Sequence, residues 1–153
     1  MGLEIERKYL VLNNNWRALG TPIHYAQGYL VADGERTVRV RIAGTIGFLT
    51  IKGQTQGFSR KEFEYEIPVA EALEMLSLCA LPVIEKYRSK IFYEGKIWEV
   101  DEFEGENKGL IMAEIELKSE DESFAIPPWI GKEVTGDIRY FNSYLAQNPF
   151  KNW

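Results

Sequence analysis

The chain alternates apolar and charged side chains over long stretches, beginning with residues 3–10. The even positions of this stretch carry Glu4, Glu6 and Lys8, whereas its odd positions are mostly apolar. Because successive side chains of a β-strand point to opposite faces, a strand here would place two carboxylates and one ammonium on one face. Such a face predicts a site for a divalent cation and an anion together, provided that other strands direct similar charges to the same place.

The same two-residue period predicts seven further strands, several of them separated by turns that contain glycine. They are expected at residues 25–31, 37–42, 48–52, 60–67, 83–93, 97–103 and 110–118. The first of these has the weakest pattern, since it carries no charged side chain. The short turns between neighbouring strands predict antiparallel pairing.

The period changes after Pro68, where residues 69–81 carry apolar side chains at helical spacing. This pattern predicts an amphipathic helix that ends at Pro82, because proline cannot continue a helix. Shorter helical elements are expected at residues 13–20, after the capping-box spacing of residues 119–122, and from Thr135, as N-cap, to about Ala146. The predicted fold class is therefore α+β.

The charged faces of the predicted strands are sorted by sign. Cations gather at Lys8, Arg39, Arg41, Lys52, Lys86 and Arg88. Carboxylates gather at Glu4, Glu6, Glu62, Glu64, Asp101, Glu114 and Glu116. A face that merely contacts water would mix the two signs more freely and would include more Ser, Thr, Asn and Gln.

Two arrangements of such strands are open. Either the apolar faces form a core and the charges face bulk water, or the sheet closes into a barrel whose wet interior is lined by the charges. The second explains the helices inserted among the strands, since they would cover the apolar outer face, and closure also removes sheet edges. The enclosed cations would then need a polyanion, because removing an ion from water costs several kcal/mol. The carboxylates would suit Mg²⁺ or Mn²⁺, which prefer oxygen ligands and bridge to phosphates.

Composition narrows the function classes. With 153 residues, 45% hydrophobic and 27% charged, the chain suits one soluble globular domain over residues 1–153. It has no apolar run that would span a membrane, and its charged N-terminus lacks a signal peptide's apolar core, so a cytoplasmic location is expected. A net charge of −5 argues against nucleic-acid binding. The single cysteine, Cys79, excludes an internal disulfide, and the single histidine, His24, argues against a histidine-based metal site or catalytic triad.

Residues 4–8 read Glu-Ile-Glu-Arg-Lys, which matches the ExExK signature of the CYTH proteins, also called triphosphate tunnel metalloenzymes. Further motifs follow in the family's order and approximate spacing, namely Arg39-Val40-Arg41, Thr50-Ile51-Lys52, Glu62-Phe63-Glu64, Lys86-Tyr87-Arg88, Trp98-Glu99-Val100-Asp101 and Glu114-Ile115-Glu116. From Glu4 to about Leu145 the chain resembles the short, single-domain bacterial members. The resemblance implies an eight-stranded antiparallel β-barrel open as a tunnel, with helices packed on the outside and near one end.

The resemblance also implies roles for the residues at matching positions. Phosphate oxygens would be bound by Lys8, Arg39, Arg41, Lys52, Lys86 and Arg88, with Arg60 and Arg139 as further candidates. Mg²⁺ or Mn²⁺ would be bound by Glu4, Glu6, Glu114, Glu116 and, as a further candidate, Asp101. Glu62 and Glu64 would support these ligands or bind a second metal, and Tyr29 would lie near the tunnel. In catalysis, Glu6 would position and activate water, while Lys8, Lys52 and Lys86 would stabilise the transition state.

The implied function is metal-dependent hydrolysis of a small-molecule triphosphate, with inorganic tripolyphosphate as the favoured substrate. Thiamine triphosphatase and class IV adenylyl cyclase are alternatives within the family, although a cyclase would need an adenine pocket that the sequence does not identify. A non-enzymatic polyphosphate- or nucleotide-binding module is a third alternative, but binding alone would need only the cations. Phe150 and Trp153 allow two interpretations, a homodimer contact or packing of the terminus.

Overall fold

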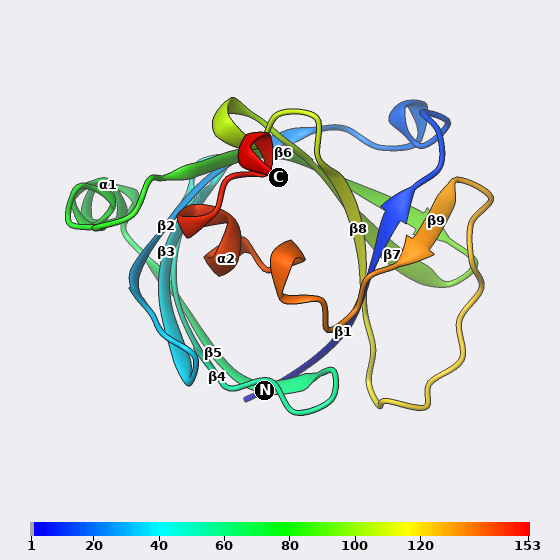
Figure 1. The fold of residues 1–153 in the computed structure, drawn as a ribbon, viewed down its shortest axis with the longest axis horizontal. Coiled ribbons are helices and arrows are strands. Elements are labelled where there is room, and N and C mark those ends of the chain that lie inside the picture. Colours follow the sequence, from blue (N-terminus) through cyan, green and yellow to red (C-terminus); the bar gives the residue numbers. More distant parts are fainter. Residues whose placement is uncertain (1) are drawn as a thin grey trace.

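The computed structural model describes residues 2–153 and places nine strands in one antiparallel sheet. Their spatial order is β5-β4-β3-β2-β6-β7-β8-β1-β9, and a β5–β1 pairing closes β1 to β8 into a barrel (Figure 1). The eight-stranded barrel predicted from the alternating pattern is therefore confirmed. The strands are β1 (Leu3–Val11), β2 (Ile23–Ala32), β3 (Arg36–Ala43), β4 (Ile46–Gly53), β5 (Ser59–Ile67), β6 (Ile84–Tyr93), β7 (Lys96–Phe103), β8 (Ile111–Glu116) and β9 (Ile130–Glu133).

Helical structure is limited to short segments. The two α-helices are α1 (Val69–Ser77), which follows β5, and α2 (Asn142–Gln147), which lies near the C-terminus. Single 3₁₀ turns occur at η1 (Arg17–Leu19), η2 (Gly105–Asn107), η3 (Ile138–Tyr140) and η4 (Phe150–Asn152). Within residues 2–153, none of the helices has both the length and the apolar character that a membrane crossing demands.

The first strand closes the barrel because it pairs along both of its edges. Its beginning pairs with β5, where Glu4 lies opposite Arg60, and its later part pairs with β8, where Lys8 lies opposite Glu114. Directly opposed residues of antiparallel strands lie on the same face of a sheet. Closure therefore turns the charged faces of β1, β5 and β8 toward a common interior.

The main apolar cluster lies on the outer face of β1, β7 and β8. It includes Trp98 and Val100 of β7 and Ile115 of β8, all of which are buried. The long connection that follows β8 contributes Trp129, whose ring packs edge-on against Trp98 at 6.2 Å between centroids. On this side, the outer face is covered by that connection and by β9, not by helices as expected. A helix, α1, does cover parts of β2, β3 and β4.

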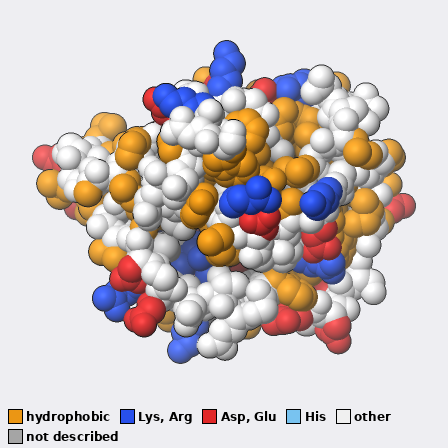
Figure 2. Space-filling view, in the orientation of Figure 1, with side chains coloured by type: hydrophobic (Ala, Val, Ile, Leu, Met, Phe, Trp, Pro, Cys, Tyr) orange, Lys and Arg blue, Asp and Glu red, His pale blue; other side chains and the backbone are white. Residues whose placement is uncertain are grey.

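The C-terminal part of the chain fills one end of the barrel from the inside. Ile84 lies two residues before Lys86 on β6 and so points inward, and it belongs to a buried apolar cluster with Tyr140 and Leu145. Figure 1 shows this segment, in orange to red, within the ring of strands. In the space-filling view of the same orientation, atoms fill most of the centre of the ring (Figure 2). We call residues 138–147, which comprise η3 and α2, the plug segment.

The α1 helix is shorter than the predicted helix over residues 69–81. It ends at Ser77, where the backbone N–H of Leu78 bonds to the carbonyl of Met75 in a tighter turn. The residue before a proline avoids the helical conformation. Leu81, the residue before Pro82, therefore stays outside the helix, and the chain continues to β6.

The predicted helix from Thr135 to Ala146 is wrong in its first half. The Thr135 hydroxyl accepts a hydrogen bond from the backbone N–H of Lys8 at 2.9 Å, so it anchors the chain to β1 instead of capping a helix. Asp137 caps η3 through the N–H of Arg139. Phe141, between η3 and α2, has an extended backbone with ψ of 135° and divides the expected helix into two pieces.

Two further differences lie between β8 and η3. Residues 119–122 form a turn instead of a helix, and the Glu122 carboxylate accepts a hydrogen bond from the backbone N–H of Lys118 at 2.6 Å. The strand β9, which pairs with the end of β1, was not predicted. Its four residues include a glycine and two charges, which is too little pattern to indicate a strand.

Trp153 packs against the plug segment. Its ring contacts those of Tyr140 and Phe150 edge-on, and its Nε1 donates a hydrogen bond to the carbonyl of Asn148 at 3.1 Å. These contacts agree with the interpretation of Phe150 and Trp153 as packing of the terminus. A homodimer stays a prediction.

Gly47 of β4 lets α1 approach the barrel, and replacing it with alanine should destabilise the protein. A Cβ at this position would lie 2.9 Å from the Ile67 carbonyl oxygen and 3.0 Å from the Ala72 Cβ of α1. Such overpacking against backbone costs about 1–3 kcal/mol, which urea denaturation can measure. Gly34→Ala is the control, since no heavy atom lies within 4 Å of its added Cβ, and its effect should stay within about 0.5 kcal/mol. Equal effects of the two substitutions would contradict the tight packing of α1.

Candidate active site

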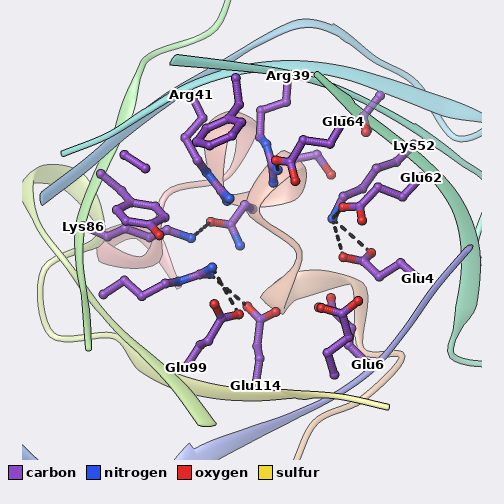
Figure 3. A pocket seen from close by; sticks show the side chains of 18 of the residues that line it. Glu4, Glu6, Arg39, Arg41, Lys52, Glu62, Glu64, Lys86, Glu99 and Glu114 are labelled. Atoms are coloured by element: carbon purple, nitrogen blue, oxygen red, sulfur yellow. Dashed lines mark hydrogen bonds and ion pairs between the residues drawn. The ribbon is translucent and has the colours of Figure 1, made fainter. Parts of the chain in front are cut away.

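The barrel encloses a charged cavity of about 230 Å³ (Figure 3). Its walls are built from the inward faces of the strands, so that alternate residues of each strand reach the same space. The cavity brings together most of the residues predicted from sequence, namely Glu4, Glu6, Lys8, Tyr29, Arg39, Arg41, Lys52, Arg60, Glu62, Glu64, Lys86, Arg88, Glu114 and Glu116. Two predicted residues, Asp101 and Arg139, do not line it.

Asp101 lies beneath the cationic wall of the cavity. Its carboxylate receives two hydrogen bonds from Arg88, at 2.7 and 2.8 Å, and lies 2.8 Å from the Lys86 Nζ. Burial alone would raise the pKa of Asp101, but Arg88 and Lys86 outweigh it and lower the pKa to about 2. With both oxygens already paired, Asp101 orients two cations and has no free oxygen to offer a metal. The prediction of Asp101 as a metal ligand therefore does not fit its surroundings.

Arg139 lies on the surface of the plug segment. Its guanidinium pairs with Asp137 at 2.8 Å and lies over the rings of Tyr140 and Trp153. It is far more exposed than the tunnel arginines, with 53% of its side-chain surface accessible. The structure gives no support to its predicted role in phosphate binding.

Several cavity residues were missed by the sequence reasoning. Lys90 and Glu99 continue the inward faces of β6 and β7, so the alternation itself could have identified them. Tyr25 also lines the cavity, and its ring centroid lies 5.0 Å from the guanidinium group of Arg41 and 5.1 Å from that of Arg88. The further lining residues are Thr37, Ala43, Phe48, Asn142 and Ser143.

Holding several buried positive charges side by side in the cavity wall is energetically unfavourable when no anion is bound. Burial, and then the neighbouring Arg39 and Arg88, lower the pKa of Arg41 to about 9. Burial, opposed by Asp101, lowers the pKa of Lys86 to about 7. The Nε of Arg39 is buried and has no hydrogen-bond partner among the described residues. A bound anion would supply the missing acceptor and stabilise the charged forms of all these groups.

The carboxylates divide into two kinds. Glu4 is already paired, because Lys52 lies 3.0 Å and Arg60 3.2 Å from its carboxylate. Although burial would raise the pKa of Glu4, these two cations lower it to about 2. Glu116 of β8, by contrast, has no ion pair or side-chain hydrogen bond with any described residue, and it lies opposite Glu6 of β1. One carboxylate thus belongs to a formed ion pair, whereas the other is free to bind a ligand.

Glu6 and Glu114 form a close pair of carboxyl groups. Burial first, and then the charges of Glu114 and Glu4, raise the pKa of Glu6 well above its usual value. Burial would also raise the pKa of Glu114, but Lys8, a hydrogen bond with Glu6 and the charge of Arg88 together hold it well below its usual range. Two neighbouring carboxylates disfavour each other's charged forms, and a bound cation would relieve this repulsion.

These carboxyl groups match the donor preferences of a hard divalent cation. Within residues 2–153 no three metal-ligating side chains already converge in metal-binding geometry. Glu6, Glu114 and Glu116 nevertheless face the same part of the cavity from two adjacent strands. Their oxygens are those that Mg²⁺ and Mn²⁺ prefer, and the mutual repulsion of the carboxylates favours a bound cation.

Comparison with known proteins places this architecture in a family. The model of the CYTH domain matches residues 2–143. A protein of Acetivibrio thermocellus named inorganic triphosphatase is 54% identical over 154 aligned positions, which cover 100% of this chain and 99% of that protein. A protein of Nitrosomonas europaea with the same name is 37% identical and covers 94% of this chain and 96% of its own length.

A solved structure supports the same relationship. The crystal structure of the inorganic triphosphatase NE1496 superposes with a TM-score of 0.65 at 34% identity, covering 94% of this chain and 93% of that one. The chain belongs to the CYTH domain family.

Proposed function

We propose that this protein hydrolyses inorganic tripolyphosphate to phosphate and pyrophosphate with the help of Mg²⁺ or Mn²⁺. The observation that carries the proposal is the barrel cavity in which a wall of buried cations faces a group of carboxylates. Relatives named inorganic triphosphatase, identical at 54% and 37% of aligned positions over nearly the whole chain, support the same reaction.

The cationic wall binds the phosphate chain in this proposal. Arg39, Arg41 and Arg88 donate hydrogen bonds to phosphate oxygens, and Lys86 lies beside them with its ammonium already oriented by Asp101. Such charge-assisted hydrogen bonds contribute roughly 1.5–3 kcal/mol each. Because these groups are fixed by the strands before the substrate arrives, they stabilise the charge that develops on the transferred phosphoryl group without reorganisation.

Glu6, Glu114 and Glu116 would hold the divalent cation, with Glu4 next to them. When bound, such an ion neutralises phosphate charge and lowers the pKa of nearby water. A water oxygen attacks the terminal phosphorus, the bond from that phosphorus to the bridging oxygen breaks, and pyrophosphate leaves. Glu6 faces the same space and is the carboxylate proposed to accept the proton released by the water.

A panel of substrates with added metal tests this proposal. We expect phosphate release from tripolyphosphate with Mg²⁺ or Mn²⁺ and loss of that activity with EDTA. ATP and thiamine triphosphate should be poor substrates. Their organic groups would have to fit at the mouth of a cavity that is lined mainly by charged side chains. Cyclic AMP formation from ATP without tripolyphosphate turnover would replace the proposal with a cyclase, and tight binding without any turnover would replace it with a binding module.

A further inference from the structure

The plug segment closes the cavity at one end with both apolar and polar contacts. Tyr140 and Leu145 pack inside the barrel against the apolar ends of the strands, including Ile84 and Phe103. Asn142 and Ser143, which lie between Tyr140 and Leu145 in the sequence, line the charged cavity itself. Beyond the apolar cluster around Tyr140 and Leu145, the interior of the barrel is lined by charged side chains. The plug segment therefore marks the end of the polar tunnel.

Asn142 makes the polar contacts at this closed end. Its Oδ1 accepts hydrogen bonds from the Lys86 Nζ at 2.9 Å and from the Gln27 Nε2 at 3.0 Å. Gln27 in turn accepts a hydrogen bond from the Nε of Arg41 at 2.9 Å through its own side-chain oxygen. Gln27 and Lys86 are both fully buried. The plug segment is therefore joined, through two neutral amides, to two cations of the phosphate-binding wall.

The neutrality of these amides matters for the charge of the cavity. A buried ammonium needs acceptors, and an amide oxygen supplies one without cancelling the charge. Lys86 already has one carboxylate partner, Asp101, at 2.8 Å. A second carboxylate in the place of Asn142 would satisfy the same hydrogen bond but would compete with a phosphate for the ammonium.

The length of the tunnel follows from the strands. From Lys86, beside the plug segment, β6 runs to Lys90, which also lines the cavity. Four residues of a strand span about 13 Å. Two strands further along the sheet, β8 also leads away from the plug segment, toward Glu116. A phosphate chain that enters past Lys90 and Glu116 therefore has room for a few phosphate units before it reaches Asn142.

We propose that Asn142 is a specificity-determining positioning residue. It holds Lys86 in place without neutralising it, and it forms the end of the tunnel against which the leading phosphate of the substrate rests. The tunnel thereby selects short phosphate chains over long ones. This inference rests on the proposed function for its substrate class, but its two tests include binding measurements that do not require hydrolysis.

The first test replaces Asn142 with aspartate, which has the same shape and retains the acceptor. We expect a Kd for tripolyphosphate at least about tenfold higher, measured by calorimetry without divalent metal, while the melting temperature stays close to that of the wild type. A purely structural role predicts the opposite, since the aspartate would strengthen the contact of the plug segment with Lys86. Gln147→Ala, on the exposed side of α2, is the control and should leave the Kd unchanged. Wild-type affinity in Asn142→Asp would overturn the positioning role.

The second test replaces Asn142 with alanine and compares tripolyphosphate with a long-chain polyphosphate. We expect the ratio of the two binding constants to shift by about tenfold or more toward the long chain, with the same shift in kcat/KM where turnover occurs. An unchanged ratio of binding constants in a folded variant would overturn the proposal that Asn142 forms the end of the tunnel. Failure of the wild type to hydrolyse tripolyphosphate would refute the proposed function alone, because the ratio of binding constants is still measured.

Discussion

Glu116→Gln should lower kcat/KM for tripolyphosphate by at least about 100-fold, since even residues that only support a metal ligand contribute 10–100-fold. Glu116 faces Glu6 across the β1–β8 pair and has no cation partner among residues 2–153. Glutamine keeps the shape of the side chain but has one neutral acceptor oxygen in place of two charged ones. It would therefore weaken binding of the divalent cation that Glu116 is proposed to hold with Glu6 and Glu114.

The fold should tolerate this change. Glu116 lies at the end of β8 and is exposed to the cavity, and substitutions at such places usually change stability by less than about 0.5 kcal/mol. Activity is measured over a range of Mg²⁺ and Mn²⁺ concentrations, and a high concentration should restore part of it if metal binding is the defect. Glu74→Gln, an exposed glutamate of α1, serves as the matched control. Full activity of Glu116→Gln at low metal would remove this residue from the metal site.

Asp101→Asn should cause the largest loss of stability. The substitution leaves two buried cations, Arg88 and Lys86, without their shared carboxylate, and breaking such a buried pair costs about 3–5 kcal/mol. For a chain of this size that corresponds to a melting temperature lower by roughly 6–20 °C. The loss should be the same with and without Mg²⁺, because neither oxygen of Asp101 is free for a metal.

The neighbouring residue provides a matched control. Glu102 also forms a two-pronged pair with an arginine, Arg17, at 2.7 and 3.1 Å, but both partners are more than a third exposed. Exposed pairs contribute about 0–1 kcal/mol, so Glu102→Gln should change the melting temperature little. The double variant Lys86→Met/Asp101→Asn should lose less stability than the sum of its single variants, because it leaves one unpaired cation fewer. Additive losses, or a loss that Mg²⁺ reverses, would contradict the structural role of Asp101.

The barrel was predictable because a strand's alternation is a local property. Glu4, Glu6 and Lys8 share a face whatever their partners are, and the same holds for each of the other charged strands. Once the inward faces are known, closure of the sheet brings their charges together. The sequence therefore identified most of the cavity wall without any knowledge of the pairing order.

The differences between the predicted residues and the cavity lining concern properties that alternation does not determine. Asp101 shares the inward face of Glu99, but its shorter side chain stays at the wall and pairs with Arg88, whereas glutamates reach the cavity. Arg139 lies on a 3₁₀ turn, where no period indicates which way a side chain points. Asn142 and Gln27 are neutral, so the sorting of charges by sign could not reveal them. Their contribution depends on a contact between segments more than a hundred residues apart.

The position of β1 between β5 and β8 has a consequence for how the protein folds. Lys8 pairs with Glu114, and Val11 pairs with Ile130 of β9, so the strand synthesised first finds its partners only when most of the chain exists. Contacts this distant in sequence slow folding, because the entropy of closing a long loop is lost before the contact forms. The hairpins from β2 to β5 and from β6 to β8 can form earlier from local pairings. We therefore expect β1 to join them last, so that the strand bearing Glu4, Glu6 and Lys8 completes both the fold and the binding site in a single late step.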